Sequence, residues 1–264
     1  MTTTPTHATL DVPGATLSYD TAGSGPLLLL VPGGAMDSQP FAGLQAALAD
    51  RFTVVRYDAR GIGASRFTGV PHPITVAGQA DDALTLIDTL SPGAAAFVLG
   101  SSGGALTGLD LITRYPERVR RLVAHEPPLT GLLDDNSAVE DDELLRIHRD
   151  QGPAAATVAF LHVTGLDGGN PADPDQLPLD LVSNFDVFYR YMFDGIGAFR
   201  ADVETLRSRP VVIGVGEASA QSAERAAHEL ARRLGQQPVS FVGEHVGFAE
   251  DPERFAKQLE PLLV

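Results

Sequence analysis

Short hydrophobic runs, each about as long as one β-strand, alternate along the chain with longer stretches whose hydrophobic residues repeat at helical spacing. The strand-length runs lie at residues 27–31, 53–57, 94–99, 119–124, 211–215 and 239–242. The helical patterns lie at residues 76–90, 219–234 and 251–263. Runs that are hydrophobic throughout predict strands buried on both faces, so we expect a mostly parallel sheet covered by helices on each side.

Two segments depart from this alternation. Residues 10–22 form two short alternating pieces around a Pro-Gly pair, which predicts a β-hairpin. Residues 130–206 contain acidic, helical and Pro/Gly-rich pieces in place of strand-length runs. We therefore expect a core of residues 1–129 and 207–264, with a small helical cap of residues 130–206 inserted into it.

The expected cap concentrates aromatic residues in a chain that has only 6% of them. Phe185, Phe188, Tyr189 and Met192 fall at helical spacing and share one face of a helix. One interpretation is packing between cap and sheet, and the other is the hydrophobic wall of a substrate site. We keep these four residues as candidates for substrate binding.

Composition and charge narrow the classes of function. The 264 residues are 44% hydrophobic and 20% charged, as in a globular protein with a full core. A net charge of −15 would repel DNA and anionic membranes, so neither is an expected partner. The absence of cysteine excludes disulfides, thiolate metal sites and cysteine nucleophiles. Because the start of the chain has neither a basic nor an apolar leader segment, we expect a cytoplasmic protein.

The strongest motif for catalysis is Gly-Ser-Ser-Gly-Gly at residues 100–104, between the hydrophobic run 94–99 and a helical pattern. A serine at such a strand–turn–helix corner needs small residues two positions away on either side, because strand and helix approach closely there. This context predicts that Ser102 is a nucleophile. An ordinary helix-capping turn is the alternative.

A serine nucleophile needs a base and donors for the oxyanion. His245 lies in the loop after the last predicted strand, where a base is expected, whereas the other histidines lie in early loops, in helical patterns or, for His125, at a strand end. The N–H of Gly103, next to the nucleophile, is one expected oxyanion donor. The N–H of Gly34, in the Pro-Gly-Gly-Ala loop after residues 27–31, is the other.

These motifs, together with Asp-Ala-Arg-Gly-Ile-Gly-Ala-Ser at residues 58–65, resemble the α/β-hydrolase superfamily over nearly the whole chain. The resemblance implies an α/β fold with a mostly parallel sheet of eight strands flanked by helices. Most members supply the acid of the triad after the penultimate strand. Here that turn holds Ser219 at the expected place and Glu217 two residues earlier.

A second position for the acid is Glu126, in His-Glu-Pro-Pro after the run 119–124. This arrangement is similar to the zearalenone lactonases, which use a glutamate after the strand that follows the nucleophile. We favour Glu126 as the acid that orients His245 and keep Glu217 as the alternative. Unlike those lactonases, which use a cap tryptophan, this chain has no tryptophan.

The motifs together predict a serine hydrolase that needs no metal or cofactor and cleaves small hydrophobic esters or lactones through an acyl-enzyme, with zearalenone-type lactones among the options. Serine in place of aspartate at the corner excludes epoxide hydrolase and haloalkane dehalogenase chemistry. A cofactor-free haloperoxidase or perhydrolase, and a ligand receptor without turnover, remain alternatives. The oligomeric state is left open, with a homodimer as one option.

Overall fold

The computed structural model describes residues 4–133, 137–167, 170, 172–219 and 222–263, and these include one nine-stranded sheet. The strands are β1 (Thr6–Val12), β2 (Ala15–Ala22), β3 (Leu27–Val31), β4 (Thr53–Tyr57), β5 (Arg66–Phe67), β6 (Ala96–Ser101), β7 (Val119–His125), β8 (Val211–Gly216) and β9 (Val239–Phe241). Their order is β1-β2-β4-β3-β6-β7-β8-β9, with β5 paired to β2. From β4 to β9 every neighbouring pair is parallel.

The sheet agrees with the pattern in the sequence, apart from one strand. β1 and β2 form the expected antiparallel hairpin, and β2 also pairs antiparallel with β4 and β5. The strand that the pattern did not predict, β5, has two residues. Two residues are too few to produce a hydrophobic run, so β5 forms because it follows a turn that brings it to β2. The predicted α/β fold with a mostly parallel sheet is confirmed.

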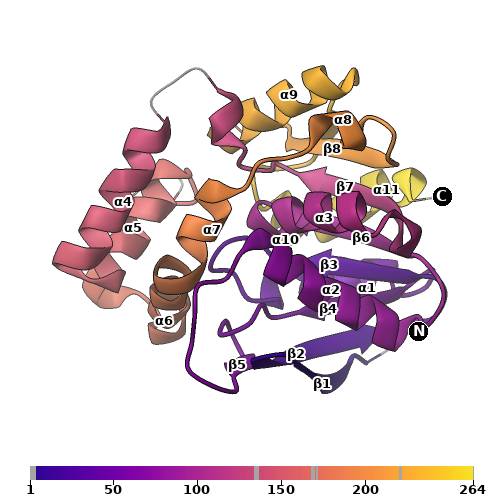
Figure 1. Cartoon of the computed structure of the whole chain (residues 1–264), viewed down its shortest axis with the longest axis horizontal. Helices are drawn as coiled ribbons and strands as arrows, with labels where there is room; N and C mark the ends of the chain where they lie inside the picture. The colour runs from indigo at the N-terminus through magenta and orange to yellow at the C-terminus, as the bar shows by residue number, and fades with distance from the viewer. Residues whose placement is uncertain (1–3, 134–136, 168–169, 171, 220–221, 264) are drawn as a thin grey trace.

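Helices bury both faces of the sheet, as the continuous hydrophobic strands require (Figure 1). In β3, Leu27, Leu29 and Val31 pack on one face, and Leu28 and Leu30 pack on the other. The first face is covered by α2 (Val76–Leu90), α3 (Gly103–Arg114) and α9 (Ser222–Leu234). The second face is covered by α1 (Ala42–Leu48), α10 (Gly247–Glu250) and α11 (Pro252–Leu259). The predicted start of the helix at residue 219 adjoins residues 220–221, which lie outside the described residues.

The described part of the chain between β7 and β8 consists mainly of helices. It contains α4 (Ser137–Gln151), α5 (Pro153–Val163), α6 (Leu179–Val187), a π-helix (Phe188–Met192), α7 (Phe193–Ala198) and α8 (Val203–Leu206). Figure 1 shows α4 to α7 grouped at one end of the sheet, on the left. Their buried residues form a hydrophobic cluster of their own with Ala35, Ala59, Ile62 and Ile74 from core loops.

Two backbone contacts attach this helical segment to the core. The N–H of Ile74 donates to the carbonyl of Tyr191 in the π-helix at 2.6 Å. A Cβ on Gly195 of α7 would lie 2.2 Å from the carbonyl oxygen of Ile74, so only glycine permits this approach. Among the helices that the structure describes, none is long and apolar enough to cross a membrane.

Candidate active site

Ser102 occupies a sharp turn between β6 and α3. Its φ of 79° lies in the left-handed region, and among the described non-glycine residues only Glu126 shares a positive φ. The N–H of Ser102 donates to the carbonyl of His125 at 2.9 Å, which attaches the turn to the neighbouring strand β7. Such a conformation costs on the order of 1–3 kcal/mol and persists because the surrounding strand and helix fix it. The turn therefore has the form that the Gly-x-Ser-x-Gly motif predicts.

Glycine is required on either side of Ser102 by close backbone approach. A Cβ on Gly100 would lie 2.3 Å from the carbonyl oxygen of Gly104, and a Cβ on Gly104 would lie 2.2 Å from that of Val31. Neither neighbour is the flexible end of a side chain, so backbone would have to move. The two glycines allow β6, α3 and the end of β3 to meet around the serine.

The Gly104→Ala variant should therefore lose both stability and activity. We expect the free energy of unfolding to fall by at least about 1–3 kcal/mol, because the new methyl group overlaps the backbone of β3. Urea unfolding and an esterase assay measure the two effects. Gly69→Ala is the matched control, since a Cβ there meets nothing within 4 Å. Equal stability of the two variants would contradict this explanation.

His245 and Glu126 are in direct contact. Nδ1 of His245 lies 2.5 Å from Oε2 of Glu126, while Oε1 of Glu126 accepts a hydrogen bond from the N–H of Gly216 at 2.7 Å. A carboxylate only accepts, so Nδ1 carries the proton and Nε2 is the free nitrogen of the ring. Glu126 is fully buried, and His245 is 8% exposed.

Glu126 is held as a carboxylate despite its burial. Burial alone would raise its pKa, but the hydrogen bond and charge of His245, helped by the nearby His125 and the Gly216 N–H, lower the pKa to about 2. The φ of Glu126 is 47°, and its own N–H donates to the carbonyl of Gly214 at 3.0 Å. The turn after β7 thus directs an ionised carboxylate toward the loop that carries His245.

Glu217, the alternative acid, lies in a different environment. Its carboxylate pairs with the guanidinium of Arg254 at 3.1 Å, and both side chains are largely exposed. Its N–H donates to the carbonyl of Phe241, which fixes the backbone of the turn after β8. The structure brings Glu126, and not Glu217, to hydrogen-bond distance of His245.

Gly34 and Gly103 lie side by side next to Ser102. A Cβ on Gly103 would be 3.1 Å from the amide nitrogen of Gly34. Gly103 is the first residue of α3, so its N–H has no acceptor within the helix. Gly34 has a φ of 53°, and a Cβ on the preceding Gly33 would come within 2.5 Å of Ser102 Cβ. The structure thus brings the backbone of both glycines close to Ser102.

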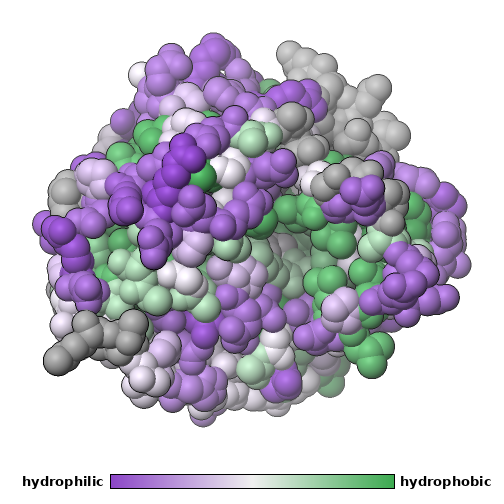
Figure 2. All heavy atoms as spheres, turned by 180° about the vertical axis from the view of Figure 1, so that it is seen from behind, coloured by the Kyte–Doolittle hydropathy of each residue, from purple (hydrophilic) through white to green (hydrophobic). Residues whose placement is uncertain are grey.

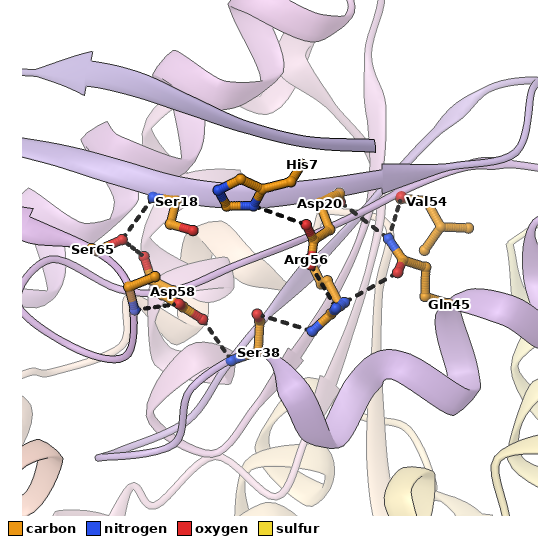
Figure 3. A network of polar contacts seen from close by, with 10 residues as sticks. His7, Ser18, Asp20, Ser38, Gln45, Val54, Arg56, Asp58 and Ser65 are labelled. Atoms are coloured by element: carbon orange, nitrogen blue, oxygen red, sulfur yellow. Dashed lines mark hydrogen bonds and ion pairs between the residues drawn. The ribbon is translucent and has the colours of Figure 1, made fainter. Parts of the chain in front are cut away.

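A polar network holds the loop that contains Gly34 (Figure 3). The carboxylate of Asp58 accepts from the N–H groups of Ser38 and Ala64, each at 2.8 Å. The hydroxyl of Ser65 donates to the carbonyl of Asp58 and accepts from the N–H of Ser18. Arg56 adds bonds to Ser38, Gln45 and Asp20. The Asp-x-Arg-Gly-x-Gly-x-Ser segment therefore ties the loop after β3 to the loop after β4.

His125, which the sequence marked as a histidine at the end of a strand, is buried beside the site. Its ring is fully buried against Phe241, Phe248 and Phe255, with ring centroids 5.7, 6.5 and 5.7 Å away. Among the described residues, neither ring nitrogen has a hydrogen-bond partner. Burial, reinforced by His245 and opposed by Glu126, lowers the pKa of His125 to about 4.

This histidine should make folding stability depend on pH. Between its ordinary pKa of 6.5 and about 4, the unfolded chain binds a proton that the folded protein does not. Stability is therefore highest above pH 6.5 and declines as the pH falls to 4, by about 3 kcal/mol at most. His125→Leu should flatten the pH dependence of the urea midpoint in this window, whereas the exposed His72→Leu should not. The same decline in both variants would exclude this origin.

Two cavities meet at Ser102. The first cavity, of about 110 Å³, is lined among others by Pro128, Leu144, Phe188, Phe193 and Ile196. The second cavity, of about 190 Å³, is lined among others by Met36, Leu161, Leu166, Leu181 and Phe185. Gly34, Ser102, Phe160 and His245 line both. In Figure 2 hydrophobic side chains gather on the right, the side of the helices between β7 and β8, and border a recess in the surface.

The four residues that were kept as candidates for substrate binding fall into two groups. Phe188 lines the first cavity and Phe185 the second. Tyr189 and Met192 are equally buried but line neither of these cavities, and Tyr189 donates its hydroxyl to the carbonyl of Ala156. Both interpretations of this helix face therefore apply: two of its residues line cavities, and the other two pack in the interior. Sequence reasoning missed Phe160, because no local pattern distinguishes the cavity side of α5.

Comparison with known proteins agrees with this geometry. A family model for the alpha/beta hydrolase fold matches residues 26–165, more than half of the chain. The chain belongs to the α/β-hydrolase family. As a whole it is 33% identical to an uncharacterized hydrolase, YraK, of Bacillus subtilis (strain 168), over 97% of this chain and 96% of the relative. The family expected from the motifs is confirmed, and this α/β hydrolase is a hydrolytic enzyme of that type.

Two further similar proteins have more specific names. The α/β hydrolase described here is 31% identical to a zearalenone hydrolase of Bionectria ochroleuca, over 96% of each chain. Among solved structures, the enol-lactonase of Burkholderia xenovorans LB400 matches with a TM-score of 0.74 and 26% identity, over 97% of this chain and 99% of that one. Both matches extend across the core and the helices between β7 and β8.

Proposed function

We propose that the protein is a serine hydrolase that cleaves carboxylic esters or lactones through an acyl-enzyme, with Ser102, His245 and Glu126 as its triad. The observation that carries this proposal is the 2.5 Å contact between His245 Nδ1 and the buried carboxylate of Glu126. It leaves Nε2 of His245 free in a cavity that Ser102 also lines. The strained turn holds Ser102 at the N-terminus of α3 and at the wall of that cavity, which is the position that a nucleophile would need.

In the acylation step, Ser102 Oγ forms a bond to the substrate carbonyl carbon while its proton passes to Nε2 of His245. The carbonyl oxygen becomes an oxyanion, which the N–H groups of Gly34 and Gly103 stabilise. Glu126 stabilises the imidazolium without taking its proton. The bond from carbon to the leaving oxygen then breaks, and His245 returns the proton to the released alcohol.

In deacylation, water takes the place of the serine. His245 removes a proton from water as the water oxygen adds to the acyl carbon. The bond from that carbon to Ser102 Oγ then breaks, His245 returns the proton to Oγ, and the acid is released. With a lactone the alcohol and the acid are ends of one product. The names of the relatives, zearalenone hydrolase and enol-lactonase, support lactones as substrates. The chain has no tryptophan, so a zearalenone-type ring would pack on the phenylalanine and aliphatic side chains that line the cavities.

A panel of p-nitrophenyl esters, aryl lactones and macrolactones tests the proposal on the purified protein. We expect multiple turnovers on at least one neutral ester or lactone, and labelling of Ser102 by a fluorophosphonate. Activity that requires hydrogen peroxide would favour the perhydrolase alternative, and a single turnover would favour the receptor. The panel contradicts the proposal if no member is hydrolysed and Ser102 is not labelled.

Further expectations about the cap, the location, the oligomeric state and cofactors accompany the proposed function. Residues 130–206 would act as a cap that covers the site, with Phe185 and Phe188 toward the substrate. The cytoplasmic location remains a prediction, which fractionation of cells tests. The oligomeric state remains open, with a homodimer as one option, and sedimentation of the purified protein measures it. A metal or cofactor is not expected, so dialysis against a chelator should leave activity unchanged.

A further inference from the structure

Phe160 stands between the two cavities that meet at the proposed nucleophile. It is the side chain of α5 that lines both, together with Gly34, Ser102 and His245 from the core. Its ring packs edge-on against Phe188 of the first cavity, at 5.6 Å and 79°, and against Phe185 of the second, at 5.2 Å and 63°. Edge-to-face contacts on both sides hold the ring in one orientation. Phe160 therefore forms a wall that both cavities share.

Each cavity is large enough to hold part of a substrate. A single water molecule needs roughly 10–15 Å³. The volumes of the two cavities, about 110 and 190 Å³, are many times larger. Both reach Ser102 and His245, so groups on opposite sides of one carbonyl carbon could occupy them together. The site thus has two compartments that both open onto Ser102 and His245.

The two cavities differ in the chemistry of their walls. Apart from Ser102 and His245, the second cavity is lined by apolar side chains and glycines. The first cavity is also lined by Thr130, Thr164 and Ser222, whose side chains carry hydroxyl groups. Thr164 already donates to the carbonyl of Phe160, which leaves its oxygen as an acceptor. A hydrocarbon group fits the second cavity, whereas a group with hydroxyl or carbonyl substituents fits the first.

Neither cavity offers a charged partner. Among the described residues that line them there is no lysine, arginine, aspartate or glutamate. A substrate carboxylate or ammonium group would lose its hydration there without an ion pair, which is strongly unfavourable. The walls therefore select against charged substrates more directly than the net charge of the whole chain does.

We propose that the substrate is an uncharged ester or lactone with a sizeable group on each side of the scissile carbonyl, one in each cavity, and that Phe160 is the specificity-determining wall between them. The inference rests on the proposed serine hydrolysis and adds the substrate class. In an ester, one cavity would hold the acyl group and the other the alcohol. In a lactone, the ring would pass around the edge of Phe160.

Three matched leucine substitutions test the compartments. Leu144 lines only the first cavity, Leu181 lines only the second, and Leu179 is 87% exposed. Two series of esters are used, one lengthened on the acyl side and one on the alcohol side, each extended until the wild-type kcat/KM falls. Leu144→Ala should raise kcat/KM for the overlong members of one series by about 10-fold, and Leu181→Ala for those of the other series only. Leu179→Ala should change neither series.

Phe160→Ala should remove the separation. Both length limits should relax in this variant, by about 10-fold each, because either group gains the space of the missing ring. A comparison of a charged with a neutral substrate completes the test. An ester ending in a carboxylate should have a kcat/KM at least about 100-fold below that of its methyl-amide analogue. If Leu144→Ala does not fold, Leu144→Val takes its place with a smaller expected gain.

The results separate failure of this inference from failure of the proposed function. If small neutral esters are hydrolysed in a Ser102-dependent way, but Leu144→Ala and Leu181→Ala relax the same series, the two compartments do not exist as proposed. The same holds if Phe160→Ala relaxes neither limit, or if the carboxylate ester is cleaved as fast as its neutral analogue. If no ester or lactone is hydrolysed, the proposed function falls first and the substrate class with it.

Discussion

Replacing Ser102 by alanine should reduce kcat/KM for ester hydrolysis by about 10³- to 10⁶-fold. The proposed acyl-enzyme cannot form without the Oγ atom, and the remaining donors only polarise the carbonyl for slow attack by water. The fold should persist, because alanine retains the Cβ atom and the N–H that donates to His125. Steady-state kinetics with a p-nitrophenyl ester, together with circular dichroism, measure both expectations.

The adjacent serine provides the matched control for this variant. Ser101 is the last residue of β6 and is fully buried, so Ser101→Ala removes an equivalent hydroxyl one position away. It should retain activity within a few-fold of the wild type. Ser102→Gly should be as inactive as Ser102→Ala but more stable, by roughly 1–2 kcal/mol, because glycine adopts a φ of 79° without strain. Full esterase activity in Ser102→Ala would exclude Ser102 as the nucleophile.

Glu126→Gln should lower kcat by about 10³- to 10⁴-fold, as loss of the acid does in other serine triads. The amide has nearly the shape of the carboxylate, but it carries no charge to stabilise the imidazolium. Its NH₂ group can also donate to Nδ1, which would place the proton of His245 on the nitrogen meant to accept from serine. KM should change much less than kcat, since Glu126 lines neither cavity.

Glu217→Gln is the comparison that identifies the acid. Glu217 faces Arg254 on an exposed surface, so this change should alter kcat by less than about two-fold. The pH dependence of stability gives a second readout for Glu126. Since its pKa is about 2 in the folded protein against an ordinary 4.5, its contribution is present above pH 4.5 and is lost as the pH falls toward 2. A collapse of kcat in Glu217→Gln alone would reverse the assignment.

Most of the core could be predicted from the sequence because its strands are buried on both faces. The run at residues 27–31 is hydrophobic at every position, and the structure uses both alternating sets of its side chains, one on each face. The two-residue strand β5 could not be predicted, since it depends on the turn fixed by Asp58 rather than on hydrophobicity. Nor could the π-helix, because the spacing of Phe188 and Met192 does not distinguish it from an α-helix.

The residues of the candidate site also divide into those that the sequence predicts and those that it does not. Ser102 and His245 stood out because each lies in a loop directly after a hydrophobic run, where the edge of a parallel sheet collects polar residues. The choice between Glu126 and Glu217 remained open because both follow strands at that edge, and side-chain direction decides which one reaches the histidine. Phe160 and His125 depend on contacts with residues far away in the chain, which no local spacing records.

The position of Glu126 directly after β7, and not after β8, has a consequence for how such an enzyme could acquire new substrates. Gly216, at the end of β8, donates its main-chain N–H to Glu126, and no side chain among the described residues of the turn that follows bonds to Glu126 or His245. Ser222 and Ala223, which follow this turn, face the first cavity. Selection for altered substrates, natural or in the laboratory, could therefore vary Ser222 and Ala223 while Ser102, His245 and Glu126, the proposed triad, stay unchanged.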